Sequence, residues 1–356
     1  MNSPAESFLP RGLATAIGSF PHTEPGPALE LIEQYLPAAP AWPQLPKRGL
    51  KENMCPQFSS GLPALQLDEG EGKIYFRVGE DLPAELEKFY LKLIEDDLEY
   101  FALGPDYALG FHAFLEYLEA GRRFPFVKGC VTGPVTFGLT VTDQDRKPSL
   151  YHPEIFDAVT KAIALKVRWQ VKKLAPFCDL PVIFIDEPYL ASVGSALVSL
   201  QVEEVIDKLN EVISAAHQEG ALAGVHCCAN TDWSILMRTG VDIISFDAFG
   251  YAKNLLLYAD HLKEFFRRGG FLAWGITPST DEIDSQDLKT LWPRLTASWE
   301  RLEELDFARG ELAARALITP SCGMGTVTPA QCEKILRVNL EISKKVLETA
   351  GEKGYA

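Results

Sequence analysis

The feature that most constrains the fold is a repeated alternation of short apolar segments with longer amphipathic ones. Segment 181–186 (PVIFID) is apolar on both faces, as a buried strand of a parallel sheet is. Segments 152–174 and 201–218 have the length and the apolar period of helices. About eight strands are predicted in this way, nearly all followed by a helix. They are 13–20, 41–46, 124–131, 181–186, 222–228, 241–247, 270–276 and 315–320.

Three details refine this pattern. Segment 41–46 is the weakest strand candidate, because its prolines interrupt a hydrogen-bonded ladder. Segment 72–78 is predicted as part of a small hairpin excursion after the second strand. For the last helix, Thr328 suits the N-cap, Gln331 completes a capping box and Gly351 suits the end.

Repeated strand–helix units favour either a closed (β/α)8 TIM barrel or an open doubly wound sheet, both α/β folds. No G-x-G-x-x-G opens a first helix, which removes the main sign of a dinucleotide-binding open sheet. No low-complexity linker divides the chain. We therefore expect a single barrel over residues 1–356, with the hairpin as an excursion from it.

Charge excludes several classes of partner. The 356 residues carry a formal net charge of -15, so the phosphate backbone of nucleic acids and anionic membranes would be repelled. Residues 1–12 lack the basic start and apolar core of a signal peptide, and no apolar run reaches the length of a membrane span. The seven cysteines are odd in number and scattered, as reduced thiols are. A cytoplasmic protein is predicted.

The barrel prediction makes the residues at the strand ends candidates for the active site. In a (β/α)8 barrel the active site lies at the carboxyl ends of the strands. Polar or ligand-type residues are predicted at these ends, where packing alone does not require them. They are Ser19, Asp186, Glu187, His226, Cys228, Asp247 and Cys322.

Four of these residues form a candidate metal site. His226 and Cys228 are two apart on a strand and share a face, whereas Cys227 points to the other side. With Asp247 and Cys322 they offer two thiolates, one imidazole and one carboxylate, a set that suits zinc. Each residue alone has a simpler interpretation: packing for the H-x-C pair, a helix cap for Asp247, and a tight loop for Cys322.

The chain resembles the C-terminal catalytic barrel of cobalamin-independent methionine synthase, in a superfamily that includes uroporphyrinogen decarboxylase. The H-x-C pair followed much later by Cys-Gly is the most specific part of the resemblance, and it covers most of the chain in the same order. The matching segments are TAIGSFPHT (15–23), VKGCVTGPVTF (127–137), FIDEPYL (184–190), VHCC (225–228), VDIISFDA (241–248) and TPSCGMGT (319–326).

The resemblance implies a zinc-dependent S-methyltransferase that acts on homocysteine and gives methionine. Its zinc would be bound by His226, Cys228, Asp247 and Cys322, with Asp247 in the place of a family Glu. The homocysteine would be held by Ile17, Gly18, Ser19 and Asp186. Asp186 and the neighbouring Glu187 are the candidate catalytic carboxylates; Glu187 is assigned either a substrate contact or a supporting role behind the site.

The same resemblance predicts an unusual methyl donor. The family's pterin-stacking tryptophan has no counterpart, since Thr140 lies near that position. An Arg-Glu pair, whose Glu contacts the pterin, is replaced by Ala191 and Ser192. The N-terminal half of the long enzyme is also missing from the resemblance. Short "core" methionine synthases with this pattern take methyl from a methylated corrinoid, which predicts methylcobalamin or a corrinoid protein as donor.

Several alternatives remain open at this stage. One is a methyltetrahydrofolate-dependent enzyme with a rebuilt pterin pocket. Another is a thiol methyltransferase of the superfamily with a simpler thiol substrate, which would not need the amino-group contact at Asp186. A decarboxylase like uroporphyrinogen decarboxylase would need no metal, and a non-catalytic zinc-binding barrel would show no turnover.

Overall fold

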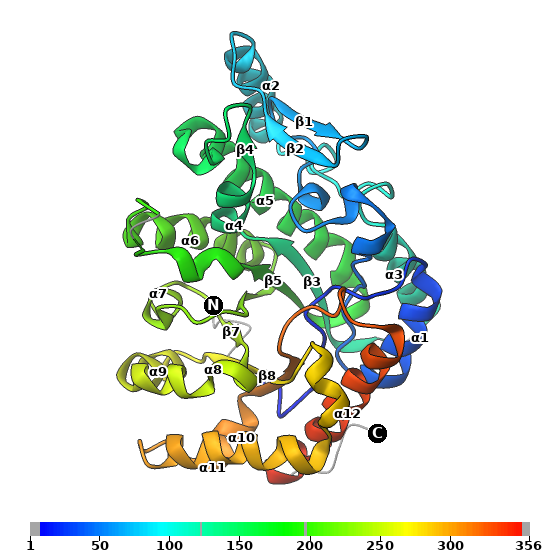
Figure 1. The fold of residues 1–356 in the computed structure, drawn as a ribbon, viewed down its shortest axis with the longest axis vertical. Helices are drawn as coiled ribbons and strands as arrows, with labels where there is room; N and C mark the ends of the chain where they lie inside the picture. The colour runs from blue at the N-terminus through cyan, green and yellow to red at the C-terminus, as the bar shows by residue number, and fades with distance from the viewer. Residues whose placement is uncertain (1–7, 122, 196–197, 351–356) are drawn as a thin grey trace.

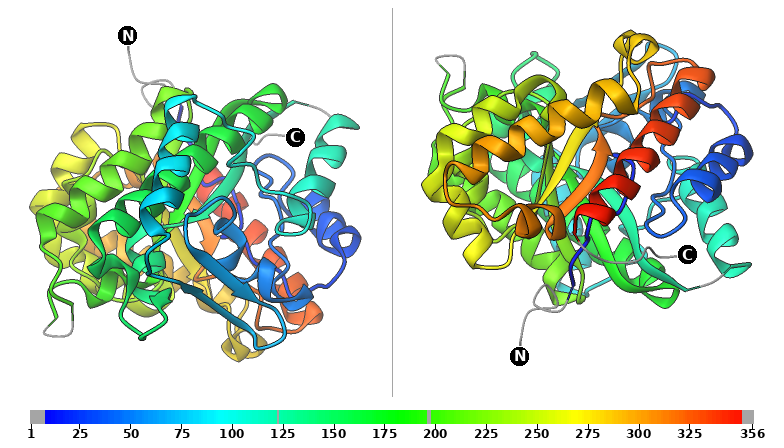
Figure 2. Two further views of the ribbon diagram at one scale, coloured as in Figure 1. Left: turned by 90° about the horizontal axis from the view of Figure 1, so that it is seen from above. Right: turned by 90° about the horizontal axis from the view of Figure 1, so that it is seen from below.

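The computed structural model describes residues 8–121, 123–195 and 198–350. The predictions for the first seven residues and for a helix end at Gly351 lie outside these ranges. At the centre is a curled sheet of six parallel strands in the order β3-β5-β6-β7-β8-β9, and helices pack around its outer side (Figures 1 and 2). The strands are β3 (Phe124–Thr132), β5 (Cys178–Asp186), β6 (Leu222–Cys227), β7 (Ile243–Phe246), β8 (Phe271–Thr277) and β9 (Ala316–Pro320).

The helices follow the strands along the chain, as the alternating pattern predicts. Helices α5, α6, α8 and α12 each pack against strands of the sheet. None of the described helices is long and apolar enough to cross a membrane. The helices are α1 (Pro25–Tyr35), α2 (Leu82–Ile94), α3 (Leu109–Glu119), α4 (Pro134–Thr140), α5 (Pro153–Leu174), α6 (Val202–Gln218), α7 (Trp233–Met237), α8 (Ala248–Leu255), α9 (Ala259–Arg267), α10 (Leu288–Glu303), α11 (Arg309–Ala314) and α12 (Pro329–Thr349).

Two of the predicted strands, 13–20 and 41–46, differ from expectation. They form no regular strand and make only isolated bridges, so within the described residues the central sheet has six regular strands where eight are expected. In the second segment the physical reason is proline, because Pro43 and Pro46 have no N–H to donate to a ladder. The isolated parallel bridges pair Ala14 with Ile318, Ser19 with Gln44, and Ala41 with Lys128.

The predicted hairpin is present and belongs to a larger excursion. Strands β1 (Leu65–Asp68) and β2 (Lys73–Phe76) pair antiparallel, and β2 also pairs with β4 (Thr142–Asp143). Together with α2, this second sheet forms one end of the molecule (Figure 1). Helix α3 (Leu109–Glu119), in the same part of the chain, has no counterpart in the sequence-based prediction.

The last helix begins as predicted. The side chain of Thr328 accepts a hydrogen bond from the Gln331 backbone N–H at 3.2 Å, and the Gln331 side chain accepts one from the Thr328 N–H at 3.0 Å. This reciprocal capping box fixes the start of α12, which packs on β9. It therefore also anchors the region that follows β9, where Cys322 lies.

Candidate metal centre and substrate cavity

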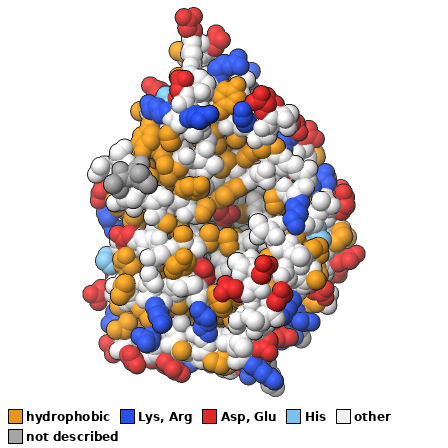
Figure 3. Space-filling model, in the orientation of Figure 1, with side chains coloured by type: hydrophobic (Ala, Val, Ile, Leu, Met, Phe, Trp, Pro, Cys, Tyr) orange, Lys and Arg blue, Asp and Glu red, His pale blue; other side chains and the backbone are white. Residues whose placement is uncertain are grey.

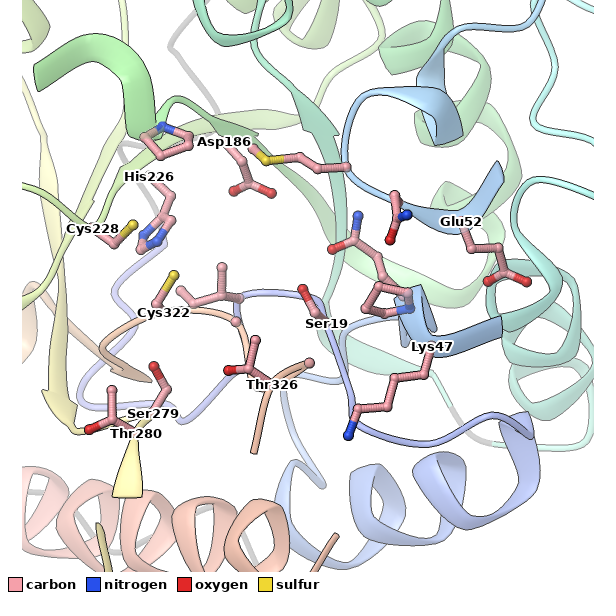
Figure 4. A pocket seen from close by; sticks show the side chains of 18 residues that line it. Ser19, Lys47, Glu52, Asp186, His226, Cys228, Ser279, Thr280, Cys322 and Thr326 are labelled. Atoms are coloured by element: carbon pink, nitrogen blue, oxygen red, sulfur yellow. The ribbon is translucent and has the colours of Figure 1, made fainter. Parts of the chain in front are cut away.

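A cavity of about 880 Å³ lies at the carboxyl ends of the central strands. Asp186 ends β5, His226 and Cys228 lie at the end of β6, and Cys322 follows β9. These side chains border the same space in Figure 4. The full lining is Ile17, Ser19, Gln44, Pro46, Lys47, Glu52, Asn53, Met54, Asp186, Pro188, His226, Cys228, Ser279, Thr280, Cys322, Gly323, Gly325 and Thr326.

His226 is oriented as a metal ligand would be. Its Nδ1 lies 3.0 Å from Ser245 Oγ, on the adjacent position of β7. When Nδ1–H donates to that hydroxyl, Nε2 presents its lone pair. This Nε2 is buried and has no hydrogen-bond partner among the described residues. A buried acceptor without a partner is costly, and a cation bound at Nε2 would satisfy it.

Two thiols face this nitrogen. The ligand atoms of His226, Cys228 and Cys322 all lie within 4.8 Å of one another. The hydrogen bond with Cys322 lowers the pKa of the Cys228 thiol, with a further contribution from His226. The same hydrogen bond and burial raise the pKa of Cys322. A metal ion bound here would displace the thiol protons, because the ligand form of cysteine is the thiolate.

Cys227 lies outside this group. It is fully buried, and its sulfur points toward the Ala229 carbonyl oxygen at 3.5 Å. Burial raises the pKa of the thiol to about 12, which keeps it protonated and inert. The alternation of side chains along β6 thus separates two neighbouring cysteines into one packing residue and one cavity residue.

Asp247, the fourth residue of the predicted ligand set, does not join the cluster. It is the N-cap of α8, and its carboxylate accepts a hydrogen bond from the Gly250 N–H at 2.7 Å. The group of ligand atoms within 4.8 Å contains only one imidazole and two thiols among the described residues. The shorter Asp side chain reaches its own helix N-terminus, which is favourable for a carboxylate.

Asp186 is the buried carboxylate of the cavity wall. Its side chain is 7% exposed, and Oδ1 has no hydrogen-bond partner among the described residues. Burial raises its pKa to about 6, an effect that electrostatic interactions with His226 and Lys128 oppose. A carboxylate in this state is suited to bind a cationic group that enters the cavity.

Of the three other predicted substrate residues, two reach the cavity. Ile17 and Ser19 line it, and Figure 4 shows Ser19 and Asp186 bordering the same space. Gly18 has a different role, because a Cβ atom there would lie 2.4 Å from Gln44 Oε1. Gly18 therefore permits the close approach of the second irregular segment.

Glu187 is buried away from the cavity. Its carboxylate accepts hydrogen bonds from the Val135 N–H at 2.9 Å, the Thr136 N–H at 2.7 Å and the Thr136 hydroxyl at 2.6 Å. These contacts dock the N-terminus of α4 against β5. Burial raises the pKa of Glu187 to about 7. Of the two assignments left open for Glu187, the contacts favour a supporting role.

The cavity also contains residues that the sequence-based analysis did not select. Gln44, Lys47, Glu52 and Asn53 lie in or just after the second irregular segment. Their proximity depends on the bridges between non-neighbouring segments, which no local pattern reveals. Gly323 also lines the cavity, and a Cβ atom there would lie 2.6 Å from Ser19 Oγ, so glycine permits the close approach of the two segments.

The three clustered ligands fit a zinc ion. Zinc in proteins is tetrahedral, with thiolate and imidazole ligands, and catalytic sites keep one position open. Two sulfurs and the free Nε2 of His226 supply three such positions. All three residues line the cavity, so a molecule bound there could supply the fourth ligand.

Comparison with known proteins gives a likeness in fold. A solved structure from Listeria monocytogenes, provisionally described as a vitamin-B12-independent methionine synthase, has a TM-score of 0.55 and 15% sequence identity. The match covers 91% of this chain and 86% of that one. A catalytic module of the pneumococcal exo-β-D-N-acetylglucosaminidase StrH has a TM-score of 0.44 and 9% identity, over 92% and 83% of the two chains. No family model and no curated protein matches the sequence.

Proposed function

We propose that the protein is a zinc-dependent methyltransferase that transfers a methyl group to the thiol of homocysteine and gives methionine. One observation carries the proposal: the cluster of His226, Cys228 and Cys322 borders the same cavity as the buried, unpartnered carboxylate of Asp186. A thiol-binding metal site and an ammonium-binding carboxylate are the two features that an amino-acid thiol requires.

Each residue of the site has a separate role in the proposed reaction. Zinc, when bound, lowers the pKa of the substrate thiol and holds it as a thiolate. Ser245 orients His226, and Asp186 receives the substrate ammonium group while Ser19 and the backbone of 17–19 hold the rest of the amino acid. The sulfur attacks the methyl carbon in line, so that the S–C bond forms as the bond to the donor breaks. The thiol proton goes to solvent, and the donor keeps the bonding electrons.

The methyl donor in this proposal is a methylated corrinoid, either methylcobalamin or a corrinoid protein. Two positions that match pterin contacts in the resembled family, Thr140 and Ser192, are absent from the cavity lining. The strongly acidic chain is also a poor match for a polyglutamate tail. Hydrophobic side chains gather on the upper and central part of one face (Figure 3). This apolar surface suits a docked carrier protein.

We propose further that residues 1–356 form one catalytic unit with the circular plan of a (β/α)8 barrel. Backbone hydrogen bonds run from Ile318 of β9 to Leu13, between Gly18 and Gln44, and from Lys128 of β3 to Pro40. These hydrogen bonds support the proposal, in which the two irregular segments take the places of the first two strands between β9 and β3.

The proposal is tested by activity that depends on zinc. Protein loaded with one equivalent of zinc is given homocysteine and methylcobalamin, and methionine is measured. Removal of the metal by a chelator should abolish methionine formation, and added zinc should restore it. Full activity without metal, or zinc binding without turnover on any pair of thiol and methyl donor, would contradict the proposal.

A further inference from the structure

A buried lysine lies beside the proposed amino-acid site. Lys128, in the middle of β3, is 1% exposed. Its Nζ donates a hydrogen bond to the Ile17 carbonyl oxygen at 2.5 Å and lies 4.4 Å from the centre of the Phe184 ring. Burial lowers the pKa of Lys128, and the nearby charge of Asp186 opposes this effect. No carboxylate of the described residues lies within ion-pair distance of the Lys128 Nζ. An ammonium group has three protons to donate, so this one is poorly satisfied.

Such a buried lysine lowers the stability of the fold. An ionised group that is buried without a partner costs several kcal/mol, whereas an apolar side chain of similar length would pack against Phe184 at no such cost. Lys166 provides a useful contrast within the same chain. It is also buried, but its ammonium donates to the Ser60 carbonyl, the Ser60 hydroxyl and the Phe101 carbonyl, which makes it a structural tie.

The register of the sheet shows which group Lys128 acts on. Lys128 pairs with Val182 and Thr132 pairs with Asp186 on adjacent strands, so the side chains of Lys128 and Asp186 lie on the same face. Each side chain contributes to the electrostatic environment of the other. The amino group of Lys128 contacts the backbone carbonyl of Ile17, and the carboxylate of Asp186 borders the cavity.

We propose that Lys128 is a positioning residue that supplies the positive pole of a site for a zwitterionic amino acid. Asp186 is the negative pole and receives the substrate ammonium group. Lys128 holds the carbonyl of Ile17, fixes segment 17–19 at the cavity wall, and favours a substrate carboxylate on that side. The inference rests on the proposed function, since it concerns the substrate of the same site, and it specifies an α-amino acid rather than a simple thiol.

The test measures binding, which does not require turnover. Calorimetry on the zinc-loaded protein gives the Kd for homocysteine and for 1-propanethiol, which has neither charged group. The wild-type protein should prefer homocysteine, and Lys128→Met should reduce this preference at least tenfold with unchanged zinc content. Lys166→Met is the matched control: it removes another buried lysine and should leave the preference unchanged. An unaltered preference in Lys128→Met would overturn the inference and leave the proposed function intact.

A second comparison uses only the wild-type protein, in case the variant does not fold. The ligand 3-aminopropane-1-thiol keeps the thiol and the ammonium group but lacks the carboxylate. It should bind at least tenfold more weakly than homocysteine, because the positive pole has nothing to attract. Equal affinity of the two ligands would contradict a role for Lys128. Equal affinity of homocysteine and 1-propanethiol would contradict both the inference and the amino-acid part of the proposed function, whereas homocysteine binding without turnover would contradict the function alone.

Discussion

Cys227 and Cys228 are neighbours in the sequence and opposites in environment. Cys228 lies beside His226 and Cys322 at the cavity, whereas Cys227 is enclosed in the core. The alternation of side chains on β6 is enough to predict this division from the sequence. The sequence alone does not predict that the loop after β9 lies close to β6, because Cys322 is more than ninety positions away from Cys228 in the chain.

The cluster predicts a specific pattern of metal loss. Cys228→Ser and Cys322→Ser should each remove most of the zinc from the purified protein, because a hydroxyl is a poor replacement for a thiolate ligand. Cys227→Ser should retain a full equivalent of zinc, although it places a hydroxyl in the core. Metal content measured by atomic emission on the three variants checks this. Equal loss in all three would show that the cluster does not bind the metal.

The buried carboxylate of Asp186 leads to a second prediction. Asp186→Asn removes the charge that meets the substrate ammonium group and keeps the size of the side chain. A hydrogen bond to a charged group contributes about 1.5–3 kcal/mol, so the KM for homocysteine should rise about ten- to hundredfold. Steady-state kinetics and zinc analysis check the change, with normal zinc content as the control. An unchanged KM would favour a simpler thiol as substrate.

At the scale of elements, the ends of helices and strands decide what single residues do. Asp247 follows β7, a position where a barrel enzyme often has a functional residue, and yet its carboxylate caps α8. Glu187 follows β5 and is engaged by the first turn of α4. Both are acidic residues at helix N-termini, where the orphan N–H groups and the helix dipole favour a carboxylate. The sequence predicts that such residues lie at the carboxyl end of the sheet. It does not predict whether their carboxylates bind a helix N-terminus or face the cavity.

The cap assignment of Asp247 leads to a third prediction. Asp247→Asn should keep a full equivalent of zinc and most of the stability of the protein, because Asn is as good an N-cap residue as Asp. Asp247→Ala should also keep zinc but lower the free energy of unfolding by about 0.5–2 kcal/mol. Competition with a zinc chelator and urea unfolding measure the two effects. A large fall in zinc affinity in Asp247→Asn would restore the carboxylate as a ligand.

The elements also show how far local patterns reach. The apolar runs of β3, β5, β6, β8 and β9 predict these strands to within about three residues, because buried parallel strands require apolar side chains on both faces. Segments 13–20 and 41–46 are also predicted as strands but make only isolated bridges. Their hydrogen bonds go to each other and to β9 and β3, and their own prolines and glycines weaken regular pairing. The residues that they bring to the cavity, such as Gln44 and Lys47, are therefore invisible to a local pattern.

For the molecule as a whole, the cavity sets the requirements for the donor. Its volume of about 880 Å³ lies near the upper end of the range of about 300–1,000 Å³ for small-molecule pockets. Homocysteine at the metal cluster would fill only part of this space. Part of the remaining lining, Pro46, Lys47, Asn53 and Met54, comes from the segment between residues 41–46 and the hairpin. In the proposed reaction, the methyl group of the donor would reach the sulfur through this remaining space.

The last prediction concerns this donor. The chain lacks an aromatic contact to a pterin that is worth about 1 kcal/mol beyond its buried area, and a hydrogen bond worth about 1 kcal/mol or more. Together these differences from the resembled family should weaken folate binding by one to several decades, whereas attack by the thiolate requires only an accessible methyl carbon. With homocysteine and zinc-loaded protein, methionine should therefore form from methylcobalamin or a methylated corrinoid protein, and little or none from methylfolate. Free methylcobalamin should be the poorer of the two corrinoid donors, because the binding energy of the carrier is then missing. A rate with methylfolate equal to or above that with every corrinoid donor would contradict this prediction and indicate a pterin site built from other residues of the cavity.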